Sequence, residues 1–167
     1  MTESTRLSPG FVHEESIYFL VEHRVSRRRR PVWFIMPIER SPVVYEHTIY
    51  LYRYESEAGR VERLATIAER PPSASLQYTK FASDGDRVVF ASQVAVDLHD
   101  GTIFELRFWD TSSGELIDPG PESRGPADSP LHRRYFAGYL SPWSANPGIV
   151  PTSDLRRMIP ELDVGLD

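Results

Sequence analysis

The sequence predicts a mainly β protein: an antiparallel meander of seven or eight strands, followed by a proline-rich C-terminal arm that bears short helices. Three observations predict this fold class. Strand-length runs rich in Val, Ile, Tyr, Phe and Trp recur between residues 16 and 117. Short turns separate these runs, which favours antiparallel neighbours. The 14 prolines and 10 glycines argue against a protein of long helices.

The strands are expected, in order, at residues 16–25, 32–38, 43–55, 60–69, 75–83, 86–97, 102–110 and 115–117. The clearest turn contains Asp84-Gly85, a step that tolerates the positive φ of a tight hairpin. His99-Asp100-Gly101 has the same turn chemistry one strand later. The run between these two turns is apolar on both faces over most of its length, so we expect it to be a central strand.

Period-two alternation assigns side chains to faces of the predicted sheets. Phe104, Leu106 and Phe108 share one face. Tyr50, Tyr52 and Tyr54 share another, and we expect this stripe to pack, for instance under the C-terminal arm. The alternative is an exposed aromatic platform for a sugar, a peptide or a base.

The composition of the chain changes after residue 118. We therefore expect a β-rich domain over residues 1–118 and a proline-rich arm over residues 119–167. Residues 119–130 are rich in Pro and Gly, and short helices are expected over 130–140 and 153–159. The arm either wraps around its own sheet or reaches a partner.

Charge and cysteine content exclude several classes of protein. The net charge of −5 argues against a general nucleic-acid binder. Without cysteine there is no disulfide and no thiolate metal site, a composition compatible with a reducing cytosol. The first ten residues are polar and no apolar run approaches the roughly 20 residues of a membrane helix. We therefore expect a cytoplasmic protein with no secretory signal and no transmembrane segment.

Residues 78–116 carry two phrases found in blades of the WD-repeat and related β-propeller families. The first phrase matches at Phe81, Ser83, Asp84, Gly85, Val88 and Phe90, and the second at Trp109, Asp110, Gly114 and Leu116. Residues 49–67 resemble the outer strands of a second blade more loosely. The resemblance implies two propeller-like blades. Because closure takes about four to eight blades, it also implies assembly with copies or partners. A small sandwich or barrel is the alternative architecture.

The most unusual segment places four arginines, Arg27, Arg28, Arg29 and Arg30, directly before an apolar run that contains Trp33 and Phe34. One interpretation is a solvated hairpin turn followed by a buried strand. Another is a docking element in which the arginines meet an acidic protein surface, anionic lipid or phosphates, with the aromatic residues as anchors. A third is RNA binding through stacking on Trp33 and phosphate contacts, which the acidic remainder of the chain disfavours. Trp143 in the arm is a further candidate anchor.

No motif in the sequence predicts a catalytic residue, a cofactor or a metal site. Asp97, His99 and Asp100 form a polar cluster at a hairpin, which we interpret as ordinary turn chemistry. Phosphate-binding loops of the Walker and dinucleotide types are absent, and so is the nucleophile elbow of hydrolases.

The sequence thus favours a non-enzymatic, protein-binding subunit or adaptor of a larger assembly. Its partner would be another protein or a second copy of the chain, with contact at a membrane surface as a further option. One alternative is a small-ligand-binding or hydrolytic β-barrel or sandwich, with a pocket that brings His47 or His99 beside a carboxylate. Another is an acidic immunity or inhibitor protein that masks a basic surface.

Overall fold

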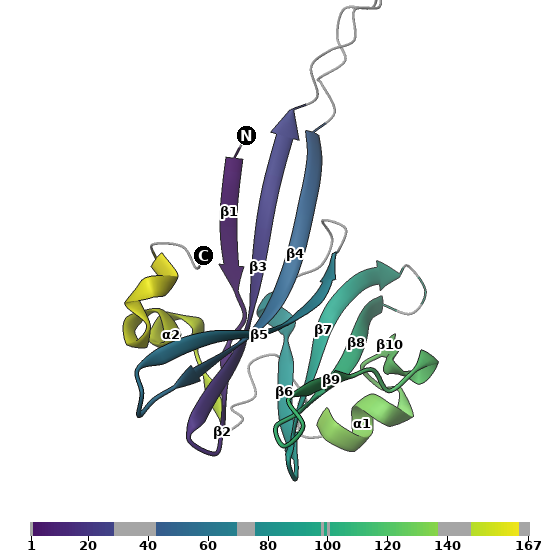
Figure 1. The fold of residues 1–167 in the computed structure, drawn as a ribbon. Coiled ribbons are helices and arrows are strands. Elements are labelled where there is room, and N and C mark those ends of the chain that lie inside the picture. Colours follow the sequence, from purple (N-terminus) through teal and green to yellow (C-terminus); the bar gives the residue numbers. More distant parts are fainter. Residues whose placement is uncertain are drawn as a thin grey trace, which may run out of the picture.

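The computed structural model of the chain describes residues 2–28, 43–69, 76–97, 99, 101–136 and 148–163. It confirms a mainly β, antiparallel protein with few helices, built from two sheets that do not close into a barrel within the described residues (Figure 1). The strands are β1 (Thr2–Leu7), β2 (Gly10–His13), β3 (Ser16–Arg28), β4 (Val43–Glu55), β5 (Arg60–Glu69), β6 (Lys80–Asp84), β7 (Arg87–Asp97), β8 (Gly101–Asp110), β9 (Glu115–Ile117), β10 (Arg124–Pro126) and β11 (Ile149–Val150). The helices are α1 (Pro130–Phe136) and α2 (Thr152–Met158), with the 3-10 turns η1 (Leu76–Tyr78), η2 (Pro121–Ser123) and η3 (Pro160–Asp163).

The first sheet has the order β11-β2-β3-β4-β5. Its longest ladder joins β3 to β4 over 13 residue pairs, from Ser16 opposite Glu55 to Arg28 opposite Val43. On its other edge β3 pairs with β2 at its start and with β1 further along. The second sheet has the order β10-β8-β7-β6, and β9 pairs with the end of β8. As expected, β7 is a central strand.

The two sheets pack face to face around the main core. We call the faces that meet the inner faces. The inner face of the first sheet contributes Leu20, Ile49 and Leu51, and that of the second contributes Phe90 and Trp109, all buried in one cluster. This packing removes one apolar face of each sheet from water.

We call the described part of residues 119–163 the C-terminal stretch. One of its helices covers the outer face of each sheet, so the described residues form four layers (Figure 1). Leu155 of α2 packs with Phe19 and Tyr52 on the first sheet, which confirms that the tyrosine stripe lies under this stretch. Phe136 of α1 packs on the second sheet against Phe104, Leu106 and Phe108, whose shared face is also confirmed.

Side chains and backbone both tie the C-terminal stretch to the rest of the chain. The Tyr135 hydroxyl donates to Asp84 Oδ2 at 3.1 Å, which joins α1 to β6. Val150 of β11 pairs with Gly10 of β2. A Cβ at Gly10 would lie 2.8 Å from Ile17 Cγ2, so glycine permits the close packing of Leu155 and Val150 here.

Five of the predicted strands coincide with the observed strands β4, β5, β7, β8 and β9 to within a residue or two. The expected strand at 32–38 and the last residues of the helix expected over 130–140 lie outside the described residues. The strands β1, β2, β10 and β11 were not predicted from the sequence. None of the helices in the described part of the chain combines the length and the apolar character needed to cross a membrane.

We predict that Leu155→Ala lowers the free energy of unfolding by about 2–5 kcal/mol, because it leaves a cavity under a fully buried side chain. Met158→Ala, in the same helix but 44% exposed, should change it by less than about 0.5 kcal/mol. Urea denaturation followed by circular dichroism measures both. Equal effects of the two substitutions would contradict the packing of α2 on the first sheet.

Candidate functional site

Most residues of the predicted docking element lie beyond the part of the chain that the structure describes. The backbones of Arg27 and Arg28 end β3, paired with Val44 and Val43 of β4. The remaining predicted anchors, Arg29, Arg30, Trp33, Phe34 and Trp143, lie outside the described residues.

The polar hairpin between β7 and β8 gives no metal site in the described residues. Asp97 ends β7 and His99 is an exposed turn residue, whereas Asp100 lies outside the described residues. No group of three or more metal-ligating His, Asp or Glu side chains is present among the described residues.

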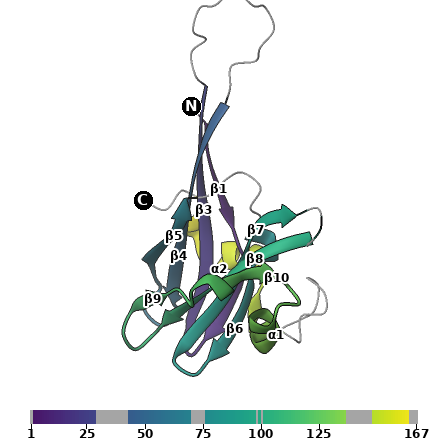
Figure 2. The same cartoon turned by 90° about the vertical axis from the view of Figure 1, so that its right-hand side faces the viewer.

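The first candidate site is a β-ribbon that extends from the body of the molecule (Figures 1 and 2). We define the ribbon as residues 23–28 of β3 and 43–48 of β4, which pair from His23 opposite Thr48 to Arg28 opposite Val43. The β4–β5 ladder ends at Thr48, and the β1–β3 ladder ends at Ser26. The ribbon therefore runs past the ends of both neighbouring ladders and leads directly into residues 29–42.

A buried polar pair marks the base of the ribbon. His47 Nδ1 donates to Glu22 Oε1 at 2.7 Å, and both side chains are at most 1% exposed. Arg24 Nη2 lies 3.7 Å from the same carboxylate oxygen. By register, Glu22 and His47 continue the inner face that carries Leu20 and Ile49, so the inner face changes from apolar to polar at this point.

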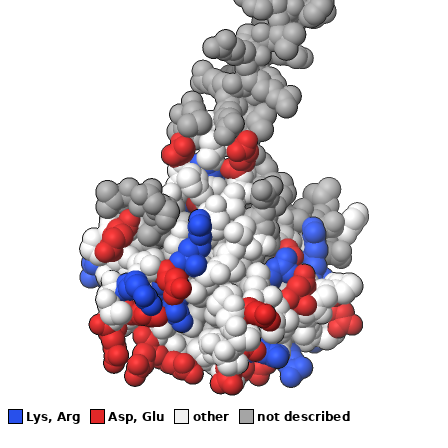
Figure 3. All heavy atoms as spheres, in the orientation of Figure 1, with Lys and Arg blue, Asp and Glu red and all other residues white. Residues whose placement is uncertain are grey.

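The second candidate site is the opposite end of the molecule, which carries four turns (Figure 1). We call it the acidic end and define it as the turns at 14–15, 56–59, 85–86 and 111–114, with three residues of strand on either side of each turn. It contains nine carboxylates and three guanidinium groups, which leaves a net charge of −6, while the whole chain carries −5. The carboxylates belong to Glu14, Glu15, Glu55, Glu57, Glu62, Asp84, Asp86, Asp110 and Glu115, and the guanidinium groups to Arg53, Arg60 and Arg87. Acidic side chains gather along this end in the space-filling view (Figure 3).

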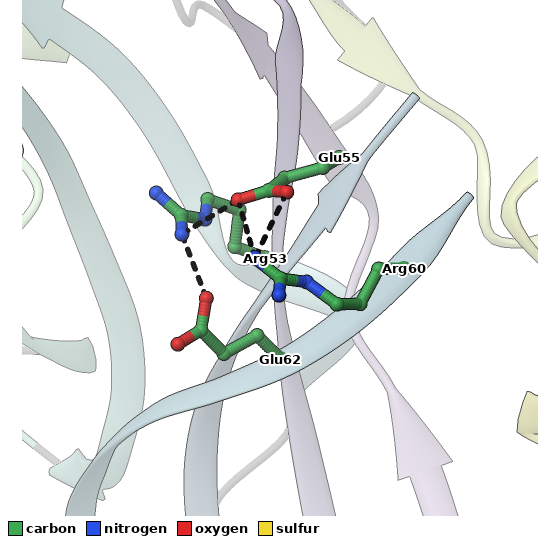
Figure 4. Close-up of polar contacts among 4 residues, drawn as sticks. All are labelled: Arg53, Glu55, Arg60 and Glu62. Atoms are coloured by element: carbon green, nitrogen blue, oxygen red, sulfur yellow. Dashed lines mark hydrogen bonds and ion pairs between the residues drawn. The ribbon is translucent and has the colours of Figure 1, made fainter. Parts of the chain in front are cut away.

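Four charged side chains form a network on the β4–β5 hairpin at the acidic end (Figure 4). Arg53 Nη2 lies 2.7 Å from Glu62 Oε2 and 2.8 Å from Glu55 Oε1. Arg60 Nη2 lies 3.2 Å from the other oxygen of Glu55. The network arises from register, because Arg53 pairs with Glu62 and Glu55 pairs with Arg60 across the two strands, which places all four on the inner face.

The pairs Arg53–Glu62 and Glu55–Arg60 each have further cross-strand neighbours on β3 and β2. Tyr18 stands beside Arg53 and hydrogen-bonds to it, while His13 shares a row with Ser16 and Glu55. Burial raises the pKa of the Tyr18 hydroxyl, and the Arg53 guanidinium partly offsets that effect. His13 is 8% exposed, and its Nε2 atom is buried with no hydrogen-bond partner among the described residues. Its ring lies edge-on to that of Tyr18, with the centroids 6.2 Å apart.

A third polar cluster lies under α1 on the outer face of the second sheet. His132 is fully buried, and its Nδ1 shares a 2.7 Å hydrogen bond with Ser129 Oγ. Its ring lies 6.0 Å from that of Phe104, over which Lys80 Nζ is placed at 4.7 Å. Burial lowers the pKa of both His132 and Lys80, and the Lys80 charge lowers that of His132 further. The Ser129 contact also lies at the start of α1, where serine is a common helix cap.

The charge network was not predicted from the sequence. Of the buried pair, His47 was expected as a candidate beside a carboxylate, but Glu22 was not identified as its partner. A signal for the network was present. Arg53-x-Glu55 and Arg60-x-Glu62 flank a short turn, so hairpin pairing alone brings opposite charges together. The Glu22–His47 contact joins residues 25 apart, and it depends on the register of a ladder whose connecting segment is long.

Comparison with known protein families, curated proteins and solved structures found no match for this chain. The function is therefore inferred from its own geometry and charge.

We predict that His132 titrates below its ordinary pKa of 6.5. Because the folded chain then binds this proton less tightly than the unfolded chain, the free energy of unfolding should fall as the pH drops below about 6.5. Proton–carbon NMR of the imidazole groups measures the titration, with the His132 signal assigned by its loss in His132→Gln. A His132 pKa at or above 6.5 would show that the folded state does not disfavour the charged imidazole.

Proposed function

We propose that the chain is a non-enzymatic, protein-binding subunit or adaptor that docks on an acidic partner surface through the ribbon and the arginine segment Arg27–Arg30. The observation that carries the proposal is the reach of the ribbon. β3 and β4 stay paired to Arg28 and Val43, beyond the ladders that flank them. The arginine segment and the aromatic residues that follow it are thus attached to the end of the molecule that lies farthest from the four turns (Figure 2).

The composition of this segment fits a protein interface. Arginine and aromatic residues supply most of the binding energy at many interfaces, because they combine a large contact area with directional hydrogen bonds. A guanidinium group also matches a carboxylate in a bidentate geometry, which a lysine ammonium group does not. Four consecutive arginines followed by Trp33 and Phe34 provide both kinds of contact.

The base of the ribbon is held in a defined position. The first sheet binds it through the β3–β4 ladder, and β1 adds a third strand as far as Ser26. The hydrogen bond between Glu22 and His47 links the two strands where the ribbon leaves the core. A ribbon fixed in this way loses less conformational freedom on docking than an unsupported loop, which favours affinity.

The sheet faces are less suitable as docking surfaces. Each sheet contains a four-strand meander, β2 to β5 and β6 to β9, which is the strand order of a propeller blade as well as of an ordinary meander. The inner faces contact each other, and α1 and α2 cover the outer faces. We therefore keep the blade relationship as a proposal and place the partner contact at the ribbon.

The hydrolytic alternative has one geometric feature in its favour, the contact between His47 and Glu22. Both side chains are buried, however, and a general base has to reach the substrate proton within hydrogen-bond distance. The pair is better suited to positioning the ribbon. The acidic end favours the inhibitor alternative as a second candidate function, because a net charge of −6 at one end could mask a basic protein surface.

Site-specific photo-crosslinking tests the proposed docking. A benzoylphenylalanine at position 33, introduced into the full chain in its native cells, should form an adduct with a defined partner protein. Reversing the charge of Arg27–Arg30 to glutamate should reduce the adduct at least about tenfold, since it removes the favourable charge pairs. The control reverses four exposed arginines elsewhere, namely Arg124, Arg133, Arg134 and Arg157.

The proposal predicts a normal adduct in the control variant. Loss of the adduct in both variants would mean that net charge rather than the ribbon governs binding, and an unchanged adduct in both would remove the ribbon as the docking site. Truncation of the C-terminal stretch is not a suitable test, because Leu155, Ile159 and Leu162 belong to the core of the first sheet.

A further inference from the structure

We infer that the acidic end of one copy of the chain is a docking surface for the ribbon and arginine segment of a second copy, so that copies associate head to tail. This inference rests on the proposed function of the ribbon and names a partner for it. It assigns the acidic end a role that the ribbon alone does not require.

The acidic end and the arginine segment lie at opposite ends of one strand, β3. β3 begins at Ser16 in the acidic end and ends at Arg28 in the arginine segment. At about 3.3 Å per residue these ends are roughly 40 Å apart. The Debye length at physiological ionic strength is about 8 Å, so the two ends of one copy do not neutralise each other. Opposite charges at this distance can pair only between molecules.

Part of the negative charge at the acidic end is not neutralised by ion pairs among the described residues. Five of its exposed carboxylates make no ion pair among the described residues: Glu14, Glu15, Glu57, Asp86 and Glu115. They come from all four turns, which lie at the end of the molecule opposite the ribbon (Figures 1 and 3). Four consecutive arginines offer a matching set of guanidinium donors.

The Nε2 atom of His13 at the acidic end is buried and has no hydrogen-bond partner among the described residues. A buried polar atom that lacks a hydrogen bond costs about 1–3 kcal/mol, so native structures rarely keep one. His13 lies on the inner face in the same row as Glu55 and directly before Glu14 and Glu15. This nitrogen is closed off from solvent, so a guanidinium group placed among these carboxylates donates to it only after the neighbouring side chains shift. With that shift, His13 adds a hydrogen bond to the charge pairs at the acidic end.

Head-to-tail contact uses two different surfaces, so a pair of copies keeps one free ribbon and one free acidic end. Such a heterologous contact produces a ring when its rotation closes and an open chain when it does not. It also predicts that a copy whose ribbon is reversed to glutamate and a copy whose acidic end is partly neutralised by glutamine form a dimer and nothing larger. The glutamate ribbon then meets no cationic end, so only one compatible contact remains between them.

Light scattering after size exclusion tests this inference with two charge variants of the full chain. In the ribbon variant all four arginines of Arg27–Arg30 are replaced by glutamate. The acidic-end variant carries Glu15→Gln, Glu57→Gln and Glu115→Gln, and its matched control carries Glu3→Gln, Glu122→Gln and Glu161→Gln, all at exposed positions. Circular dichroism melts establish that each variant folds.

In about 50 mM salt we expect the wild-type chain and the control to associate as their concentration rises. The ribbon variant and the acidic-end variant should each associate with themselves at least about tenfold more weakly, and an equimolar mixture of the two should give a heterodimer mass. Association should weaken at about 0.5 M salt, where screening is stronger.

Two outcomes would overturn the inference: a wild-type chain that stays monomeric at about 100 μM, or a mixture of the two variants that stays monomeric. If the ribbon variant still loses its photo-adduct in either case, the proposed function stands and its partner is a different protein. If the adduct also survives ribbon reversal, both the proposed function and this inference fail. An acidic end that captures a basic protein while the chain remains monomeric would instead support the inhibitor alternative.

Discussion

Both sheets of this protein carry a buried apolar cluster on each face, and the rest of the structure follows from that constraint. A sheet with two apolar faces has to be covered twice. Mutual packing covers one face of each sheet, around Leu20 and Phe90. The two remaining faces are covered by α1 and α2, with Phe136 and Leu155 at their centres. The C-terminal stretch is therefore part of the core of both sheets.

The same constraint explains how the ribbon can leave the body. Along β3 the inner-face side chains change from Tyr18 and Leu20 to Glu22 and Arg24, and on β4 they change from Leu51 and Ile49 to His47. Beyond this change the strands no longer need cover from the second sheet, because their polar groups pair with one another. The position of one buried hydrogen bond thus sets where packing ends and an accessible surface begins.

Turn residues at the ends of strands made many strand bounds predictable from the sequence. Strands that form only by pairing with distant segments were not predictable in this way. The bounds expected for β4, β5 and β9 coincide with the observed bounds, because apolar runs and turn residues mark both ends of these strands. In contrast, β1 is a polar segment with four consecutive exposed residues, and β10 contains Gly and Pro, so only their pairing with β3 and β8 makes them strands.

β5 has two bulges, at Leu64 and Ile67, which turn both side chains to the core at a spacing of three. Period-two reasoning places such residues on opposite faces. The bulges lie beyond Arg63, so they change the faces of the far half of β5 and leave the pairing of the charge network unchanged.

The pairing of β11 with β2 has a consequence for the order of events during synthesis. Residues 149 and 150 complete an edge that begins at residues 10 and 11, and α2 then covers the outer face of the first sheet. Until these late residues leave the ribosome, that sheet exposes an apolar face and an unpaired β2 edge. Contacts between such distant residues slow folding, and an uncovered face or edge is the kind of surface that chaperones bind. Residues that are made after the rest of the first sheet therefore determine when its early strands become stable.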